Sequence, residues 1–186
     1  MIFSFVLALK PKEALLPVPS FYEYRQALES VDCHLRKVTL REDEDFQLQE
    51  EFLEQIQKDT DVVVLCNPNN PTGQLIDQKL SEQIAIRCTK TGTCLLMDEC
   101  FHDFLEDGMA HTLLPLVAEN PKIFLLKAFT KMYGMAGLRL GYGICSDVEL
   151  IRKMEQVSQP WNVSVPAQAA GIAAVKETEF VKKSRK

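Results

Sequence analysis

TKMYGMAGLRLGY, residues 130–142, is the stretch that decides the fold. It follows Ile123–Leu126, an apolar run typical of a buried strand. Where a strand opens into a loop, a lysine such as Lys131 can direct its amine into a cleft. Arg139 keeps its charge and suits bidentate phosphate binding. The stretch predicts a Schiff-base lysine with a phosphate anchor. The alternative is a surface lysine and arginine on a glycine-rich turn, since both residue types are mostly exposed.

Two further motifs follow strand-like runs. NPNNPTG at residues 67–73 comes directly after the run 62–66, and turn chemistry alone would account for it. Asp98 and Glu99 follow a second apolar run, and an acid at such a strand end commonly faces the ligand crevice of a parallel sheet. The rival interpretation is a ribose-binding acid of a dinucleotide fold. That fold requires Gly-x-Gly-x-x-Gly after its first strand, and the sequence has none.

In this order and spacing, the three motifs resemble those of the fold-type I pyridoxal-phosphate (PLP) enzymes, and within them the class I/II aminotransferases. The resemblance extends from Met1 to about Glu179. It implies that residues 1–180 form the PLP-binding large-domain core and that residues 181–186 are a basic tail, expected to fray. It also implies that the N-terminal phosphate-binding turn and the C-terminal small domain of such enzymes lie outside this sequence, which leaves the fold incomplete at both ends.

Secondary motifs point to two subfamilies. NPNNPTG and the Ala-Gly-Leu-Arg run are shared with histidinol-phosphate aminotransferases, but Phe101 stands where those enzymes usually carry a tyrosine. The stretches 19–24, 40–48, 101–104 and 159–163 look most like threonine-phosphate decarboxylase of cobalamin biosynthesis. The resemblance therefore implies decarboxylation of O-phospho-L-threonine through a lysine aldimine. The alternatives are an aminotransferase acting on histidinol phosphate or another amino acid, and a non-catalytic folded fragment.

The resemblance assigns roles in PLP chemistry residue by residue. Lys131 would form the aldimine and shuttle the proton, and Asp98 would keep the pyridine nitrogen protonated. Asn70 would donate to the ring phenolate oxygen, and Arg139 would bind the phosphate.

Further positions surround the cofactor or depart from the family pattern. Phe21 would stack on the ring, with Tyr24 as the fallback and core packing as the alternative for both. Phe101 lacks the hydroxyl that a tyrosine would offer the phenolate oxygen. Ala128 stands where relatives often carry a phosphate-binding hydroxyl, and Thr130 is the candidate replacement. Trp161 and Asn162 are expected to pack at a helix entry or to line the cleft.

Strand-like and helix-like runs alternate along the chain. Strands are expected at residues 35–40, 62–66, 93–97, 123–126 and 138–145, and helices at 1–9, 21–31, 48–57, 77–90, 147–157 and 166–176. Ser20 and Asp147 are expected to act as N-caps, and Ile86 to face inward with Leu80 and Ile84. The alternation predicts an α/β fold with three layers, in which helices cover both faces of a mostly parallel central sheet.

The composition of the chain limits the classes of molecule that it is expected to bind. A net charge of −5 and a pI of about 5.3 argue against nucleic acid or an anionic membrane, and no apolar run is long enough to span a bilayer. The expected partners are a small amino-acid or amino-acid-phosphate substrate and a second copy of the chain, since members of the family are homodimers.

The cysteines and histidines predict no metal site. The cysteines are Cys33, Cys66, Cys88, Cys94, Cys100 and Cys145. They form no Cys-x-x-Cys pair and are typical of buried packing in a reducing compartment, so we expect a cytoplasmic protein. The three histidines have no ligand spacing. His102, which follows the Asp98 motif, is expected to be structural or on the surface.

Overall fold

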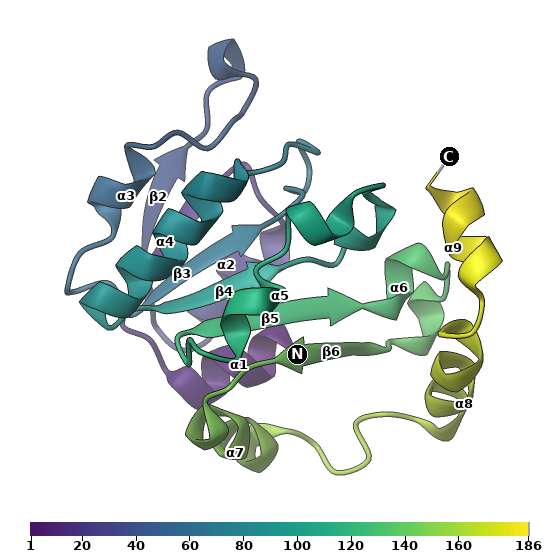
Figure 1. Ribbon diagram of the computed structural model, residues 1–186. Helices are drawn as coiled ribbons and strands as arrows, with labels where there is room; N and C mark the ends of the chain where they lie inside the picture. The colour runs from purple at the N-terminus through teal and green to yellow at the C-terminus, as the bar shows by residue number, and fades with distance from the viewer. Residues whose placement is uncertain (186) are drawn as a thin grey trace.

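The computed structural model of the chain describes residues 1–185. At its centre is a six-stranded sheet in the order β2-β1-β3-β4-β5-β6 (Figure 1). The strands are β1 Glu13–Val18, β2 His34–Thr39, β3 Val62–Cys66, β4 Cys94–Asp98, β5 Ile123–Ala128 and β6 Gly141–Ile144. Strands β1 to β5 pair in parallel, and β6 pairs antiparallel with β5. The prediction of a mostly parallel sheet is confirmed.

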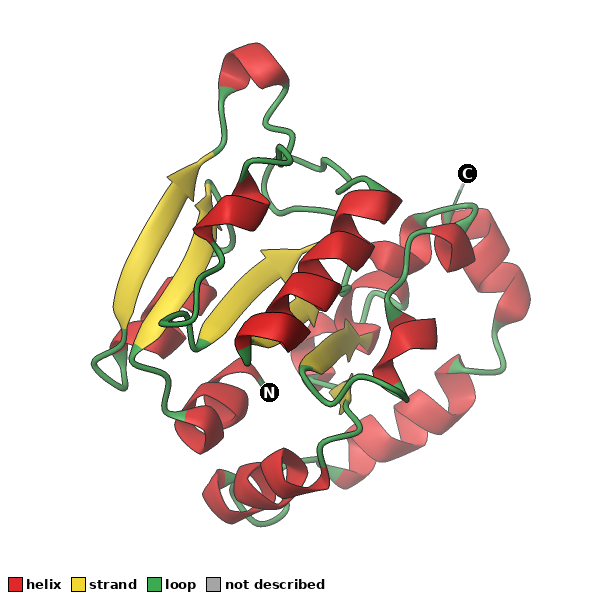
Figure 2. Ribbon diagram, turned by 60° about the vertical axis from the view of Figure 1, so that its left-hand side comes forward, coloured by secondary structure: helices red, strands yellow, loops and turns green. Residues whose placement is uncertain are grey.

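Helices cover both faces of the sheet, so the three-layer prediction is confirmed as well (Figure 2). One face packs against α1 Ile2–Leu9, α2 Tyr22–Glu29 and α7 Val148–Val157. The other face packs against α3 Phe52–Gln55, α4 Gln78–Thr91 and α5 Leu114–Val117. The remaining helices are α6 Phe129–Met132, α8 Val165–Ala174 and α9 Thr178–Ser184, and the 3-10 turns are η1 Glu42–Glu44, η2 His102–Phe104, η3 Gly108–Ala110 and η4 Ala136–Leu138.

The two faces of β4 lead to two different polar groups. Cys94 and Leu96 belong to the core under α1, α2 and α7, whereas Leu95 and Met97 belong to the core under α3, α4 and α5. Because successive side chains of a strand point to opposite faces, the acids that follow are separated by the sheet. The Asp98 side chain is on the same face as Cys94 and Leu96, and the Glu99 side chain is on the same face as Leu95 and Met97.

Several local expectations are wrong. Helix α2 begins after Phe21, and no side chain caps it, so Ser20 is not its N-cap. Only one helical turn, α3, forms within residues 48–57, although Phe52 and Ile56 are buried. Ile86 is 52% exposed on the outer side of α4. The predicted strand at 138–145 is shortened to β6, because residues 136–138 form the turn η4. Asp147 does cap α7: its Oδ1 accepts from two backbone N–H groups of the first turn.

The C-terminal segment folds against the rest of the chain, which corrects the expectation of a frayed tail. Helix α9 lies beside α6 in Figure 1, and the ring of Phe180 stacks on Tyr133 with centroids 6.4 Å apart. Arg185 donates from Nε to the backbone oxygen of Asp103 at 2.8 Å. Lys186, the last residue of the predicted tail, lies outside the described residues. Among residues 1–185, no helix is long and apolar enough to cross a membrane.

Candidate active site

The candidate site lies at the carboxyl ends of the central strands. Cys66, the last residue of β3, is the register partner of Asp98, the last residue of β4, and Leu126 of β5 is the partner on the other side. Loops that carry the sequence motifs follow each of these strand ends. Open α/β sheets bind ligands at this edge.

Asp98 is a buried carboxylate held by neutral donors. The Tyr24 hydroxyl donates to its Oδ2 at 2.6 Å, and the backbone N–H of Cys100 donates to its Oδ1 at 2.9 Å. Asp98 is only 4% exposed. Burial, and next the negative charge of Asp98, raise the pKa of Tyr24 well above its usual range. Tyr24 therefore remains a proton donor, and the negative charge of Asp98 stays available for a cationic partner.

Lys131 lies in the one-turn helix α6 directly after β5. Its side chain is exposed, and its Nζ is 5.1 Å from the centroid of the Phe101 ring, a cation–π distance. Thr130, next to it, is half-buried, and Ala128 precedes α6 without a hydroxyl.

Cys100 is partly buried beside the acid, because its backbone N–H donates to Asp98 Oδ1 at 2.9 Å. Burial, and next the charge of Asp98, raise the pKa of the Cys100 thiol. The thiol therefore stays protonated at neutral pH.

Arg139 lies between the turn η4 and β6, so it is at the same edge of the sheet as Lys131 and Asp98. It has a left-handed backbone conformation at φ 55°, and its side chain is exposed. Its Nη1 donates to the backbone oxygen of Ala136 at 3.1 Å, which leaves the other guanidinium N–H groups for an anion.

Phe21 and Asn70 lie at the border of the site. The Phe21 ring meets Tyr24 edge-on, with centroids 5.5 Å apart, so it is one ring away from Asp98. Asn70 lies in the loop that follows β3, where the Cys66 thiol donates to the backbone oxygen of Pro68 at 3.1 Å, next to the Asp98 rung of the sheet. Each residue expected to bind a cofactor therefore lies at the same edge of the sheet as Asp98.

Trp161 and Asn162 do not pack at a helix entry. The Trp161 side chain is 95% exposed, and Asn162 is exposed too. The backbone at Trp161 is left-handed, with φ 62°. The packing expectation for these residues is therefore wrong, and the expectation that they line the cleft stays a prediction.

The cysteines pack as predicted. All six are free, and Cys33, Cys66, Cys88 and Cys94 are buried. Burial raises the pKa of the Cys66 thiol to about 12 and that of Cys88 to about 12, so neither is a thiolate at neutral pH.

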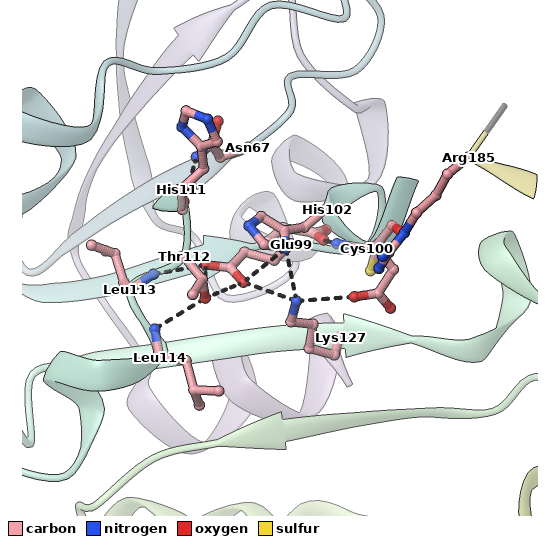
Figure 3. Close-up of polar contacts among 12 residues, drawn as sticks. Asn67, Glu99, Cys100, His102, His111, Thr112, Leu113, Leu114, Lys127 and Arg185 are labelled. Carbon is pink, nitrogen blue, oxygen red and sulfur yellow. Dashed lines mark hydrogen bonds and ion pairs between the residues drawn. The ribbon is translucent and has the colours of Figure 1, made fainter. Parts of the chain in front are cut away.

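The structure also contains a polar cluster that the sequence analysis did not predict (Figure 3). It lies on the face opposite Asp98, because Glu99 and Lys127 each follow one residue after the Asp98–Leu126 pair. Lys127 Nζ lies 3.0 Å from Glu99 Oε2, 3.2 Å from His102 Nδ1 and 3.3 Å from Asp103 Oδ1. Thr112 Oγ1 donates to both Glu99 oxygens, at 3.0 and 2.8 Å. His102 is buried in this cluster, which agrees with the structural role expected for it. The sequence signal was a lysine ending the apolar run of β5.

The chain matches the family model for aminotransferase class I and II over residues 1–186. It belongs to this family. It is 38% identical to the threonine-phosphate decarboxylase of Salmonella typhimurium over 181 residues, 96% of this chain and 49% of that protein. It is 39% identical to a putative threonine-phosphate decarboxylase of Caldanaerobacter subterraneus over 190 residues, 100% of this chain and 50% of that protein.

Solved structures agree with the fold. The chain superimposes on the histidinol-phosphate aminotransferase from Clostridium acetobutylicum with a TM-score of 0.88 and 26% identity, covering 98% of this chain and 55% of that one. The chain spans about half the length of the curated relatives it matches. The comparisons show an enzyme family and an α/β fold, as the motifs predict.

Proposed function

We propose that the protein binds pyridoxal 5'-phosphate at the carboxyl edge of β3, β4 and β5, through Lys131, and that the reaction it serves is decarboxylation of an amino-acid phosphate of the O-phospho-L-threonine type. The observation that carries the proposal is the buried Asp98 carboxylate, held by neutral donors, at the sheet edge where Lys131 lies 5.1 Å from the Phe101 ring.

The side chains fit PLP group by group. An aldehyde carbon requires a primary amine, which Lys131 supplies from an exposed position. A pyridine nitrogen stays protonated beside a carboxylate, which Asp98 supplies. A phosphate requires a cation, which Arg139 supplies from an exposed position. Asn70 and Thr130 are the proposed donors to the ring oxygen and the phosphate, and Phe21 and Phe101 the aromatic neighbours of the ring.

PLP supplies the electron sink for the pair left when a bond at the substrate Cα breaks. Asp98 holds the proton on the pyridine nitrogen. Lys131 would act as general base or acid at the substrate Cα, because its exposed amine lies at the same edge of the sheet as Asp98. Phe101 offers a ring face to the Lys131 ammonium and no hydroxyl, so its part is to orient the amine.

Binding is tested by absorption after PLP is added to the wild type and to Lys131→Ala. A visible band that borohydride traps on Lys131, identified by peptide mass, is expected for the wild type alone. Lys153→Ala, which removes an exposed lysine on α7, is the matched control and should keep the band. A wild type without a band would refute PLP binding and favour a non-catalytic folded module.

The reaction is tested with the protein, PLP and O-phospho-L-threonine. Release of carbon dioxide without consumption of a 2-oxo acid is the expected result. A second candidate is transamination of histidinol phosphate, which the likeness to the Clostridium acetobutylicum enzyme favours. Consumption of a 2-oxo acid in step with an amino donor, without carbon dioxide, would support that candidate instead. We also propose a cytoplasmic homodimer, to be checked by analytical ultracentrifugation and cell fractionation.

A further inference from the structure

Lys127 uses its whole donor capacity on one short loop. An ammonium group has three N–H donors. Its three acceptors belong to Glu99, His102 and Asp103, at 3.0, 3.2 and 3.3 Å. Because an ammonium can only donate, Nδ1 of His102 is the acceptor in this contact. The loop that follows β4 is therefore anchored at three points to a single atom of β5 (Figure 3).

The Glu99–Lys127 ion pair lies on the face of the sheet opposite Asp98, one residue further along both strands. Asp98 pairs with Leu126 in the β4–β5 register, and the Glu99 N–H donates to the Leu126 oxygen at 2.8 Å. Glu99 and Lys127 each follow one residue later, on the other face of the sheet. Their side chains are 0% and 10% exposed. The ion pair therefore clamps the two strands at the rung next to the proposed cofactor acid.

Both strands continue from the clamp directly into the site. Phe101 comes two residues after Glu99, and Lys131 comes four residues after Lys127. The two meet again at the 5.1 Å contact between the Lys131 Nζ and the Phe101 ring. Segments 99–101 and 127–131 therefore contact each other at both ends. The Glu99–Lys127 ion pair joins them at one end, and the contact of Lys131 with Phe101 joins them at the other.

An ion pair is a costly way to fill a buried space, because apolar side chains of similar volume are often as stable or more stable. Unlike apolar contacts, the hydrogen bonds of the ion pair are directional, so they fix the ends of β4 and β5 in one relative position. We propose that Glu99 and Lys127 are positioning residues, which hold Lys131 and Phe101 in place relative to Asp98. This inference rests on the proposed function in so far as Lys131 is the residue that binds PLP.

The test is the double variant Glu99→Gln/Lys127→Met. It removes both charges together, and the amide oxygen introduced at position 99 would still accept from the Leu113 N–H, which is 3.0 Å from Glu99 Oε1. Lys127→Arg is the rescue variant, since arginine keeps the charge and suits buried pairs. Arg36→Met is the matched control: it breaks the ion pairs of Arg36 with Glu13 at 3.7 Å and Asp59 at 3.3 Å, and its hydrogen bond to Thr60, far from the site at the amino ends of β2 and β1.

Two measurements separate this role from a merely structural one. Hydrogen exchange reports on amides of segments 99–104 and 128–133, with α7 as the internal reference. Titration with PLP reports the affinity and wavelength of the band at Lys131. We expect the folded double variant to exchange at least tenfold faster in both segments, and to bind PLP at least tenfold more weakly with a shifted band. Lys127→Arg should restore both properties, and Arg36→Met should change neither.

Unchanged exchange in both segments overturns the proposal. Faster exchange with an unchanged PLP band also overturns it, because the pair is then only a local stabiliser. If the wild type itself forms no band, the proposed function fails, and the exchange data alone decide whether the pair positions the two segments.

Discussion

Asp98 and Glu99 are adjacent in sequence, but only Glu99 has a cationic partner within the described part of the chain. Glu99 is completely buried with the Lys127 ammonium 3.0 Å away, so its charge is balanced within the chain. Asp98 is nearly as buried, but its partners at 2.6 and 2.9 Å are a phenol and a backbone N–H. None of the ion pairs among residues 1–185 includes Asp98. One acid is satisfied by the protein, and its neighbour retains a charge for a ligand.

The contrast shows how a strand end can separate rigidity from reactivity. Alternation along β4 places the two acids on opposite faces, so the stabilising pair never competes with the ligand for the same carboxylate. A buried charge without a cation is costly unless hydrogen bonds hold it, and Tyr24 and Cys100 provide them. The two faces should therefore respond differently to equivalent substitutions.

The largest difference is expected between Lys127→Met and Asp98→Asn. Lys127→Met leaves Glu99 buried without its cation, which should cost about 3–5 kcal/mol of unfolding free energy. The amide introduced by Asp98→Asn could still accept from the Cys100 N–H and donate to the Tyr24 oxygen, so this substitution should cost about 1 kcal/mol or less. Urea unfolding measures both. Equal losses would mean that the two acids are not held differently.

Tyr24→Phe tests how strongly the Tyr24 hydroxyl stabilises the buried Asp98 carboxylate. It removes a charged hydrogen bond of 2.6 Å from a buried carboxylate, which should cost about 1.5–3 kcal/mol. Tyr22→Phe, two residues earlier and 66% exposed, is the control and should leave the unfolding midpoint unchanged. If both substitutions have the same effect, the Tyr24 hydroxyl is not what holds Asp98.

A smaller effect is expected from pH on the Glu99 side. Burial lowers the pKa of His102 below its usual 6.5, although the charge of Glu99 opposes this. The unfolded state then binds the proton more readily, so this contribution to stability is full above about pH 6.5 and is lost as pH falls towards the folded pKa. His102→Asn, which keeps an acceptor for Lys127, should flatten the stability profile below pH 6.5. If the variant keeps the slope of the wild type, His102 is not the cause.

The smallest effect is expected for an ion pair in water. Arg25 and Glu29 lie one helical turn apart at 2.6 Å, with side chains 48% and 46% exposed. Exposed pairs contribute little because solvent screens them. Arg25→Ala should leave the thermal midpoint within error of the wild type. A loss comparable to that of Lys127→Met would show that burial does not distinguish the two pairs.

The sequence predicted what local patterns determine. The apolar runs of β3, β4 and β5, the Asp147 cap and the three motifs at the strand ends all depend on neighbours along the chain. The amphipathic spacing of residues 48–57 failed because Phe52 and Ile56 reach the core from a single turn and its flanks. An apolar periodicity does not distinguish a helix from a segment that wraps the core.

The Glu99–Lys127 ion pair could not be predicted from the sequence for a different reason. Its members are 28 residues apart, and their meeting depends on the exact β4–β5 register. A shift of one residue would place Lys127 on the Asp98 face. The exposure of Trp161 was not predicted, because nothing in the sequence marks its left-handed backbone.

The connection between β5 and β6 has a consequence for the order of assembly. Lys131 and Arg139 lie within one antiparallel hairpin, closed where the Phe129 N–H donates to the Leu140 oxygen at 3.1 Å. A loop this short closes at little entropic cost. Asp98, in contrast, joins them only through pairing with a strand far along the chain, and such contacts form slowly. Lys131 and Arg139 thus form a locally encoded unit that folding can complete before Asp98 joins it.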